Sequence, residues 1–329
     1  PDELLGPGFQ MSFAATTALV AVFGALRGRE VPGMPRFLRP VLAVLISSLV
    51  AGLATAPFAA AHFNQISHYG LIANLLSVPL MGILVMPAGV LAACLAPLGL
   101  AWIGLWFMDL GLRWILFVAR TIASADGAVS HIVTPQAAFL PVFALGVLWL
   151  ILWRGRARWA GLVPAAFAFV LWAQSGRPTL LVADTGSLIG MMGPEGRALS
   201  KATGDGFAAD SWLENDGNPV AQEIAAARPG LTRDPLIRAS IGATDVVLVT
   251  GKTRLAGLDG GCDGADILVT NMVDDVDRPC DVYDIARLRR TGALALSVDE
   301  AGALRIVTAR DVTGARLWNT APTRRASRP

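Results

Sequence analysis

The sequence is poor in charged residues. Asp, Glu, Lys and Arg make up 16 % of its 329 residues, whereas a soluble domain averages about 25 %. The shortage is confined to one part: residues 1–176 hold 14 charged side chains and residues 177–329 hold 38. Hydrophobic residues reach 54 % and the mean hydropathy is +0.54. This composition excludes an ordinary cytosolic enzyme. It predicts an α-helical polytopic membrane domain over residues 1–176 and a soluble domain over residues 177–318. The pattern of strands and helices given below assigns the soluble domain to the α/β class.

Histidine is equally scarce. The chain has three, His62, His68 and His131, at spacings that fit no metal site. Because none follows His131, a histidine metal centre, a histidine general base and a Ser-His-Asp triad are excluded from the soluble domain. The glycine-rich stretch 257–264 lacks the phosphate-loop pattern, and the aspartates between 263 and 281 lack the calcium-loop spacing. We therefore expect no catalytic residue, no metal and no cofactor there.

Six apolar segments approach the roughly 20 residues that a membrane span needs. They are Phe9–Leu26, Pro40–Ala61, Tyr69–Leu95, Leu98–Ala123, Ala137–Trp153 and Arg158–Gln174. Pro79 and Pro87 interrupt the third segment, and the fourth carries charges. Two interpretations are open: all six segments cross the membrane, or the third is re-entrant and the fourth lies flat at the interface.

The arginines in the short loops predict the orientation of these segments. Four follow the first segment and three follow the fifth, whereas loops 62–68 and 124–136 contain no Lys or Arg. The first basic loop contains Arg27, Arg29, Arg36 and Arg39, and the second contains Arg154, Arg156 and Arg158. Since cytoplasmic loops carry the excess of Lys and Arg, we expect both basic loops in the cytoplasm. Both interpretations then place the soluble domain in the periplasm, with the membrane domain in the inner membrane.

Asp109, Arg113 and Arg120 form the sharpest polar set within the apolar segments. At 100° per residue they fall within about 40° of one another on a helix. Asp109 and Arg113 are also an i,i+4 pair of opposite charge. One interpretation is the wall of a water-lined path, with cations available for an anion. The other is an amphipathic helix that turns these charges to water at the interface.

A second polar set consists of His62, Asn64, Gln65 and Asn74. A loop that turns back into the membrane must pair its backbone with protein groups or line a water-filled cavity. These side chains can supply such partners. The alternative for the histidine is a purely structural hydrogen bond.

The soluble domain shows short apolar runs separated by turn residues. Strands are predicted at 179–183, 187–192, 197–199, 245–250 and 266–270, and helices at 220–227 and 281–290. Residues 293–298 and 304–309 are predicted to pair through the turn 299–302. Cys262 and Cys280 lie 18 positions apart in this domain. They can form a disulfide in an exported domain, or remain small buried residues. Residues 319–329 are predicted to be a disordered tail.

Two stretches resemble a known family. PDELLGPGFQMSFAATTALV is similar to the Gly-Phe-Gln-Leu-Ser-Phe signature of ComEC-type competence proteins, the inner-membrane DNA channels of natural transformation. TAPFAAAHFNQISHYGLIANLLSVPL resembles the same family's Tyr-His-Phe-Gly and Ala-Asn-Leu-Leu-Ala-Val-Pro segment. Together these stretches cover Asp2–Leu80. Because the family's amino-terminal part is missing here, the resemblance implies a carboxy-terminal fragment.

In that family a metallo-β-lactamase-like domain follows the membrane domain. LLVADTGSLIGMMGPEG resembles its opening strand and hairpin, with Asp184 and Gly186 at the first Asp and Gly of Leu-Asp-Val-Gly-Gln-Gly-Asp. Residues 265–271 and 281–292 resemble a later strand and helix. Where the family has His-His-Gly-Ser, this chain has Asn271-Met272-Val273, and the His-x-His-x-Asp-His motif has no counterpart. The resemblance therefore implies a degenerate domain without metal ligands.

The resemblance implies uptake of single-stranded DNA through a channel, with both polar sets as candidates for the DNA path. The implied partners are single-stranded DNA, the lipid bilayer, a DNA receptor, a cytoplasmic translocase and a further copy of the chain. The alternatives are a membrane-anchored metal-dependent nuclease or hydrolase, and a non-catalytic scaffold. The nuclease would need metal ligands that the soluble domain lacks, so we do not expect an enzyme.

Overall fold

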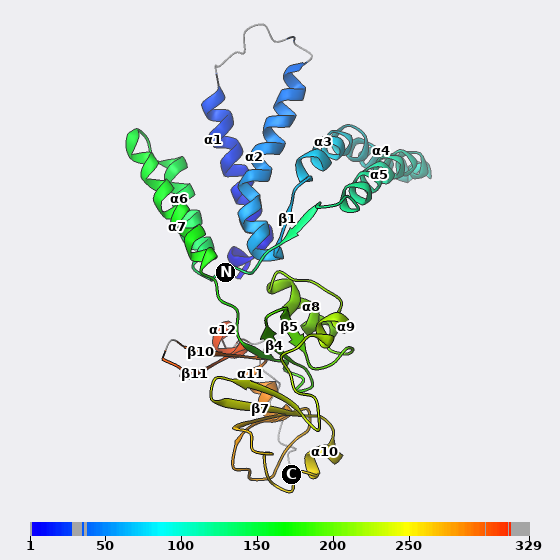
Figure 1. Cartoon of the computed structure of the whole chain (residues 1–329). Helices are drawn as coiled ribbons and strands as arrows, with labels where there is room; N and C mark the ends of the chain where they lie inside the picture. Colours follow the sequence, from blue (N-terminus) through cyan, green and yellow to red (C-terminus); the bar gives the residue numbers. More distant parts are fainter. Residues whose placement is uncertain (1, 28–34, 36–37, 300, 315, 317–329) are drawn as a thin grey trace, which may run out of the picture. The chain divides into compact units, whose positions relative to one another are not determined.

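The computed structural model describes the chain except residues 1, 28–34, 36–37, 300, 315 and 317–329. The predicted tail at 319–329 lies outside the described residues. The chain divides into two compact units, Pro1–Ser175 and Gly176–Pro329 (Figure 1).

The first unit is almost entirely helical. Its elements are η1 (Asp2–Leu5), α1 (Pro7–Leu26), α2 (Leu38–Phe63), α3 (Gly70–Leu80), η2 (Met81–Val85), α4 (Met86–Leu95), η3 (Ala96–Leu98), α5 (Ala101–Ala123), α6 (Phe139–Leu152), η4 (Arg156–Gly161) and α7 (Leu162–Ala173). Four helical runs are long and apolar enough to cross a membrane: Pro7–Leu26, Val41–Phe63, Gly70–Leu98 and Ala101–Ala123. The fifth and sixth predicted segments form shorter helices, of 14 residues in α6 and 12 in α7.

The third predicted segment is one helical run in spite of its two prolines. Proline lacks the N–H that an α-helix needs, so a helix that contains it must change its hydrogen bonding locally. Here the residues between Pro79 and Pro87 include a stretch of wider π-helix, η2, that joins α3 to α4. The run from Gly70 to Leu98 therefore stays helical.

Small residues let α5 pack closely on α4 and η2. A Cβ added at Gly104 would lie 2.4 Å from the backbone nitrogen of Ala92, and one at Gly111 would lie 2.6 Å from a methyl carbon of Val85. Val118 is buried seven residues further along α5. The packed face of α5 thus recurs every seven residues, which is the spacing of a helix–helix seam.

The other helices of this unit also pack in pairs, α1 with α2 and α6 with α7 (Figure 1). Phe139 is fully buried and contacts the rings of Phe143, Phe169 and Trp172. Two short strands, β1 (Gln65–Ser67) and β2 (Val129–His131), form an antiparallel ribbon. This ribbon joins the segment after α2 to the segment before α6.

The second unit is an α/β sandwich. Its strands are β3 (Leu180–Val182), β4 (Ile189–Gly193), β5 (Gly196–Leu199), β6 (Ile237–Ile241), β7 (Thr244–Val249), β8 (Ile267–Thr270), β9 (Asp281–Tyr283), β10 (Leu294–Val298) and β11 (Leu304–Thr308). Its helices are α8 (Gly206–Asn215), α9 (Gln222–Ala227), α10 (Lys252–Ala256), α11 (Ile285–Thr291) and α12 (Ala309–Thr313). One sheet has the order β11-β10-β3-β4-β5 and is antiparallel. The other has the order β6-β7-β8-β9 and is parallel beyond its first pair.

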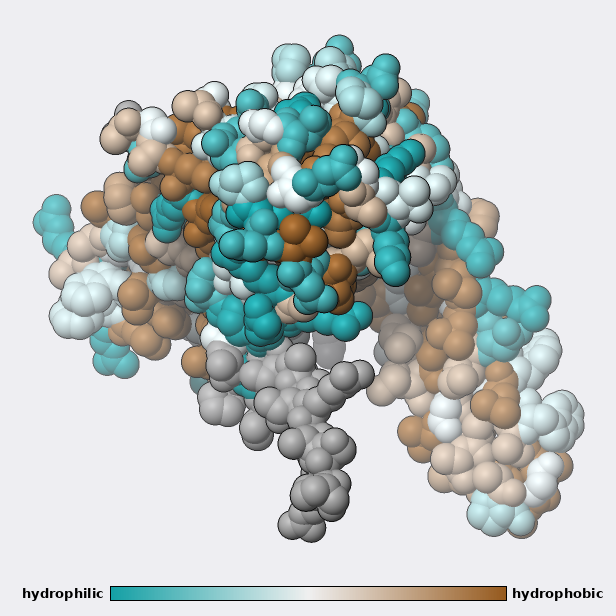
Figure 2. Space-filling view, turned by 90° about the horizontal axis from the view of Figure 1, so that it is seen from below, coloured by the Kyte–Doolittle hydropathy of each residue, from teal (hydrophilic) through white to brown (hydrophobic). Residues whose placement is uncertain are grey.

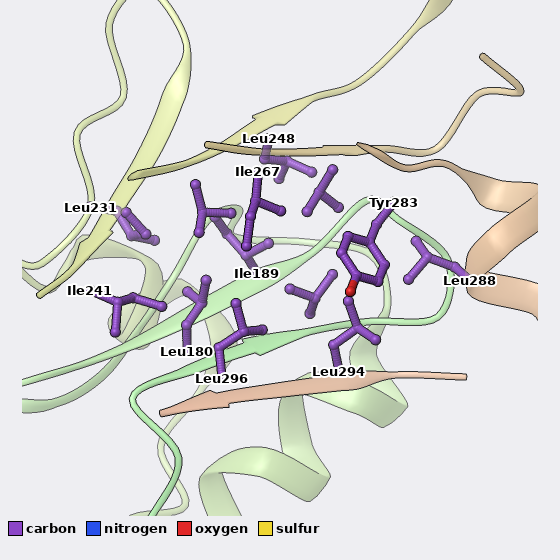
Figure 3. Close-up of a cluster of buried hydrophobic side chains, with 14 of the residues drawn as sticks. Leu180, Ile189, Leu231, Ile241, Leu248, Ile267, Tyr283, Leu288, Leu294 and Leu296 are labelled. Atoms are coloured by element: carbon purple, nitrogen blue, oxygen red, sulfur yellow. The ribbon is translucent and has the colours of Figure 1, made fainter. Parts of the chain in front are cut away.

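The main core lies between the two sheets (Figure 3). Leu180 and Ile189 of the first sheet face Leu248 and Ile267 of the second. Since successive strand residues point to opposite faces, the neighbouring residues form the outer layers. Leu181 and its neighbours pack against α8 and α9, and Val247, Val249 and Leu268 pack against Leu255 of α10. The face of this unit that Figure 2 turns to the viewer carries many hydrophilic residues.

The predicted fold class, a helical membrane domain followed by an α/β region, is confirmed. The hairpin of β10 and β11 pairs Val298 with Leu304 as predicted. The single helix predicted at 281–290 is wrong at its start: Asp281–Tyr283 is strand β9, and Asp284 caps α11 by accepting a hydrogen bond from the backbone nitrogen of Arg287. An N-cap residue is extended rather than helical, so the chain before it is free to pair with β8.

Candidate functional site

Asp109 and Arg113 pair across one turn of α5, as their i,i+4 spacing predicts. Arg113 Nε donates to Asp109 Oδ2 at 2.6 Å. Both side chains are largely exposed, at 76 % for Arg113 and 53 % for Asp109. Arg120 is exposed on the same helix and forms no ion pair within the described ranges. A cation is therefore left on this face with no carboxylate beside it.

This charged face points away from the seam that packs α5 on α4. At 100° per residue, Asp109, Arg113 and Arg120 lie about 140–180° around the helix from Gly104. Gly111 and Val118 share the side of Gly104. α3 contacts another part of α5, where Trp114 Nε1 donates to the carbonyl oxygen of Leu76 at 3.1 Å. Within the described residues, no helix covers the charged face.

The second predicted set is not one cluster. His62 and Asn64 make hydrogen bonds inside the protein, whereas Gln65 on β1 and Asn74 on α3 are exposed. His62 Nε2 lies 2.8 Å from Oε1 of Gln10 on α1. Sequence reasoning missed Gln10 as a partner, although it stands in the Gly-Phe-Gln stretch that carries the family resemblance.

Asn64 closes the carboxyl end of α2. Its φ of 56° is left-handed, a conformation that asparagine tolerates better than most residues. The side chain is 5 % exposed, and its Nδ2 donates to Oγ1 of Thr134 at 2.6 Å and to the carbonyl oxygen of Ile132 at 3.3 Å. These bonds fasten the end of α2 to the chain that follows β2. The geometry supports a structural role for Asn64.

His68, directly after β1, also links the two loops by hydrogen bonds. Its backbone nitrogen donates to the carbonyl oxygen of Ala128, and its Nε2 lies 2.7 Å from Oγ of Ser130. The loops 62–68 and 124–136 are thereby held side by side. They lie at the same end of the helices that they connect.

The second unit lacks the metal-ligand motifs of the family that it resembles. Asn271, which stands at the family's histidine pair, accepts a hydrogen bond from the backbone nitrogen of Gly251 at 2.9 Å. Among the described residues, no three His, Cys, Asp or Glu side chains lie close enough to hold a metal ion. The residues present therefore do not fit a two-metal centre, and we derive no metal chemistry from them.

The turn after β3 has a backbone conformation that requires glycine at position 186. Gly186 has a φ of +64°, and an added Cβ would lie 2.3 Å from the carbonyl oxygen of Thr270 at the end of β8. No other residue fits this close approach. The turn therefore rests directly on the end of the neighbouring sheet.

A polar cluster follows that turn. Lys201 Nζ donates to Asp205 Oδ2 at 2.6 Å and to Ser187 Oγ at 3.0 Å. Ser187 Oγ also donates to Asp205 Oδ2. Burial alone would raise the pKa of Asp205, but the hydrogen bonds and the charge of Lys201 lower that pKa below its ordinary value. The ammonium group of Lys201 faces this carboxylate, so the cluster offers no free base to activate Ser187.

The two cysteines of the second unit are joined. Cys262 and Cys280 form a disulfide with a Cα–Cα distance of 6.2 Å. Cys94 on α4 is free and exposed. Next to the disulfide, Arg278 Nε donates to Asp274 Oδ2 at 2.5 Å, and both side chains are almost fully buried. The loop between the cysteines is therefore held by the disulfide and by the buried ion pair of Arg278 with Asp274.

Comparison with protein families gives a match over the first unit. Residues 1–157 match the family model described as Competence protein. The match extends well beyond Asp2–Leu80, where the resemblance was read from sequence. It covers α1 to α6 and the start of η4, including both candidate polar sets. Neither the curated proteins nor the solved structures contain a match to the chain.

Proposed function

We propose that the chain forms part of an inner-membrane channel for single-stranded DNA, on the premise that residues 1–157 match the model of the Competence protein family. The family match supports a role in competence, and the four long apolar helices indicate membrane insertion. The channel role rests on the charged face of α5. Asp109, Arg113 and Arg120 share one side of a membrane-length helix, and no described helix packs against that side.

The spacing of these charges suits a chain of phosphates. Arg113 and Arg120 are seven residues apart, which is about 10 Å along a helix. That distance is close to the reach of a couple of nucleotides of single-stranded DNA, and a conduit needs cations that attract without trapping. Asp109 holds Arg113 by an ion pair and moderates its attraction. Arg120 has no such partner among the described residues and supplies the stronger contact.

The test is natural transformation in cells that carry the full-length gene. Arg113→Gln combined with Arg120→Gln is expected to lower the number of transformants at least tenfold at unchanged protein level. Asp109→Asn should have a milder effect. Arg254→Gln, which changes an exposed arginine outside the membrane unit, is the control. Unchanged transformation in the double variant would assign α5 to the membrane interface and end the proposal that it lines the path.

The proposed orientation places the second unit in the periplasm. The two loops without Lys or Arg lie together at the β1–β2 ribbon, which supports their assignment to one side of the membrane. A reporter that is active only in the periplasm, fused after Asn319, should be active. An inactive periplasmic reporter together with an active cytoplasmic one would reverse the orientation.

The proposed partners follow from this arrangement. A DNA receptor on the periplasmic side would deliver the strand, and a cytoplasmic translocase would pull it, because the chain has no phosphate-loop pattern for ATP. A further copy of the chain is a candidate to cover the open face of α5. Crosslinking from a cysteine placed at Arg120 in living cells would identify which of DNA, lipid or protein lies there.

A further inference from the structure

An open groove of about 610 Å³ lies in the first unit between α1 and the turn that joins α6 to α7. α1 lines it from Ser12 to Ala25, and α6 contributes its last residues, Ile151 and Leu152. Most of the lining is apolar. Arg158, which follows α6 in the chain, is the charged residue among those that line the groove.

Arg158 is held in place but its charge is not neutralised. Its Nε donates to the carbonyl oxygen of Leu150 at 3.2 Å, and its guanidinium carbon lies 5.5 Å from the centre of the Trp159 ring. No Asp or Glu forms an ion pair with it in the part of the chain that the structure describes. Arg154 and Arg156 are exposed nearby in sequence. The groove therefore joins an apolar trough to an unpaired cation.

The length of the groove distinguishes between a lipid acyl chain and a second membrane helix as its occupant. Ser12 and Ala25 are 13 residues apart, which is about 20 Å along α1. A hydrocarbon core is about 30 Å thick, so a single leaflet is about 15 Å. The groove is long enough for an acyl chain of one leaflet. A second membrane helix that spans the hydrocarbon core would be longer than the groove and would extend beyond it.

We propose that this groove binds an anionic phospholipid, with an acyl chain along α1 and the phosphate at Arg158. Arginine pairs with phosphate through two parallel hydrogen bonds, which are stronger than neutral ones. Arg27 and Arg39, at the carboxyl end of α1 and the start of α2, are also exposed. Such a basic membrane edge concentrates anionic lipids. The lipid fills the space beside α1, a helix with no buried residue of its own.

The experiment measures lipid binding to the delipidated full chain by native mass spectrometry. Phosphatidylglycerol and phosphatidylcholine with identical acyl chains are titrated separately. The wild-type chain should bind phosphatidylglycerol more tightly than phosphatidylcholine. Arg158→Gln should weaken phosphatidylglycerol binding about tenfold, the loss of one charge-assisted contact. Arg158→Lys keeps the charge but not the two parallel hydrogen bonds, so it should weaken binding by a smaller factor. Arg156→Gln is the matched control, because it lies in the same turn but does not line the groove.

A second variant tests the trough itself. Ala21→Phe places a ring in the groove and should abolish retention of both lipids, while the circular dichroism of the chain stays unchanged. Equal affinity for the two lipids, or equal effects of Arg158→Gln and Arg156→Gln, would overturn the proposal. So would a dimer that persists without lipid and that Ala21→Phe dissociates, because a second copy would then occupy the groove.

Discussion

His62 and Gln10 are joined side chain to side chain, with 2.8 Å between His62 Nε2 and Gln10 Oε1. The first stands near the end of α2 and the second near the start of α1, in the two stretches that resemble competence proteins. Hydrogen bonds between membrane helices are worth about 0.6 kcal/mol on average. The contact therefore orients α1 on α2 more than it stabilises the pair.

A double-mutant cycle on this pair should show a small coupling. Gln10→Ala, His62→Ala and the double variant are unfolded in mixed micelles, and the coupling free energy should be about 0.6 kcal/mol, with about 1.7 as an upper bound. Strictly additive effects of the two substitutions would show that the side chains do not interact.

The register of the β1–β2 ribbon can be tested by disulfide trapping. Ser67 and Val129 are directly opposed, and opposed residues have Cβ atoms about 5 Å apart. In a Cys94→Ser background, Ser67→Cys with Val129→Cys should therefore crosslink readily on oxidation. Ser67→Cys with Ser130→Cys is the control, since neighbouring strand residues point to opposite faces. Efficient crosslinking of the control pair would contradict the register.

Replacement of Asp216 should destabilise the second unit. Its carboxylate accepts from Arg197 at 2.5 Å and from Arg177 at 2.7 Å, and the Arg197 side chain is fully buried. Removing one partner of a buried ion pair costs about 3–5 kcal/mol. Asp216→Ala should therefore lower the free energy of unfolding by that amount. Fluorine NMR of 5-fluorotryptophan at Trp212 during urea unfolding measures it.

The control for this variant lies on the preceding helix, α8. Asp210 is exposed there, and Asp210→Ala should change the free energy of unfolding by less than about 0.5 kcal/mol. Similar losses in both variants would mean that the buried pair has no special contribution.

The lowered pKa of Asp205 predicts an acid-sensitive cluster. Its pKa in the folded chain lies below the unfolded value of about 3.9. The carboxylate therefore contributes stability above that value, and the contribution is lost as the pH falls through the folded pKa. As the pH is lowered from about 5 to about 2, the urea concentration at the unfolding midpoint of the second unit should decrease. The decrease should be less steep in Asp205→Asn. Parallel curves for the two proteins would contradict this.

The disulfide should be present in protein isolated without reductant. Peptide mass spectrometry is expected to find Cys262 linked to Cys280, and Cys94 as a free thiol. Closing a loop of about this length stabilises a fold by about 3 kcal/mol in the chain-entropy model. Cys262→Ser with Cys280→Ser should lose a stability of that order. Detection of free thiols at both positions would show that the disulfide does not form.

Sequence patterns predicted those elements whose signal is local. The β10–β11 hairpin is visible in the alternation around Asp299, and the charged face of α5 follows from the spacing of Asp109 and Arg113. Helix α8 was missed because Gly206 and the polar residues after it resemble a loop. Its burial of Trp212 against the sheet overrides that preference.

The ribbon and the partner of His62 depend on residues far apart in sequence. β1 and β2 have three residues each and pair over a gap of about 60 positions, so neither carries a strand pattern of its own. Gln10 and His62 are 52 positions apart, and only the packing of α1 on α2 brings them together. Single-sequence reasoning has no means to pair such residues.

The ribbon also has a consequence for the segment between its strands. Residues 68–128 leave the rest of the unit at Ser67 and return at Val129, and these two residues are direct neighbours. An insertion whose ends meet can be exchanged or deleted without stretching the chain on either side. The helices α3 to α5 are therefore a cassette, and a short turn from Ser67 to Val129 should leave α1, α2, α6 and α7 able to fold.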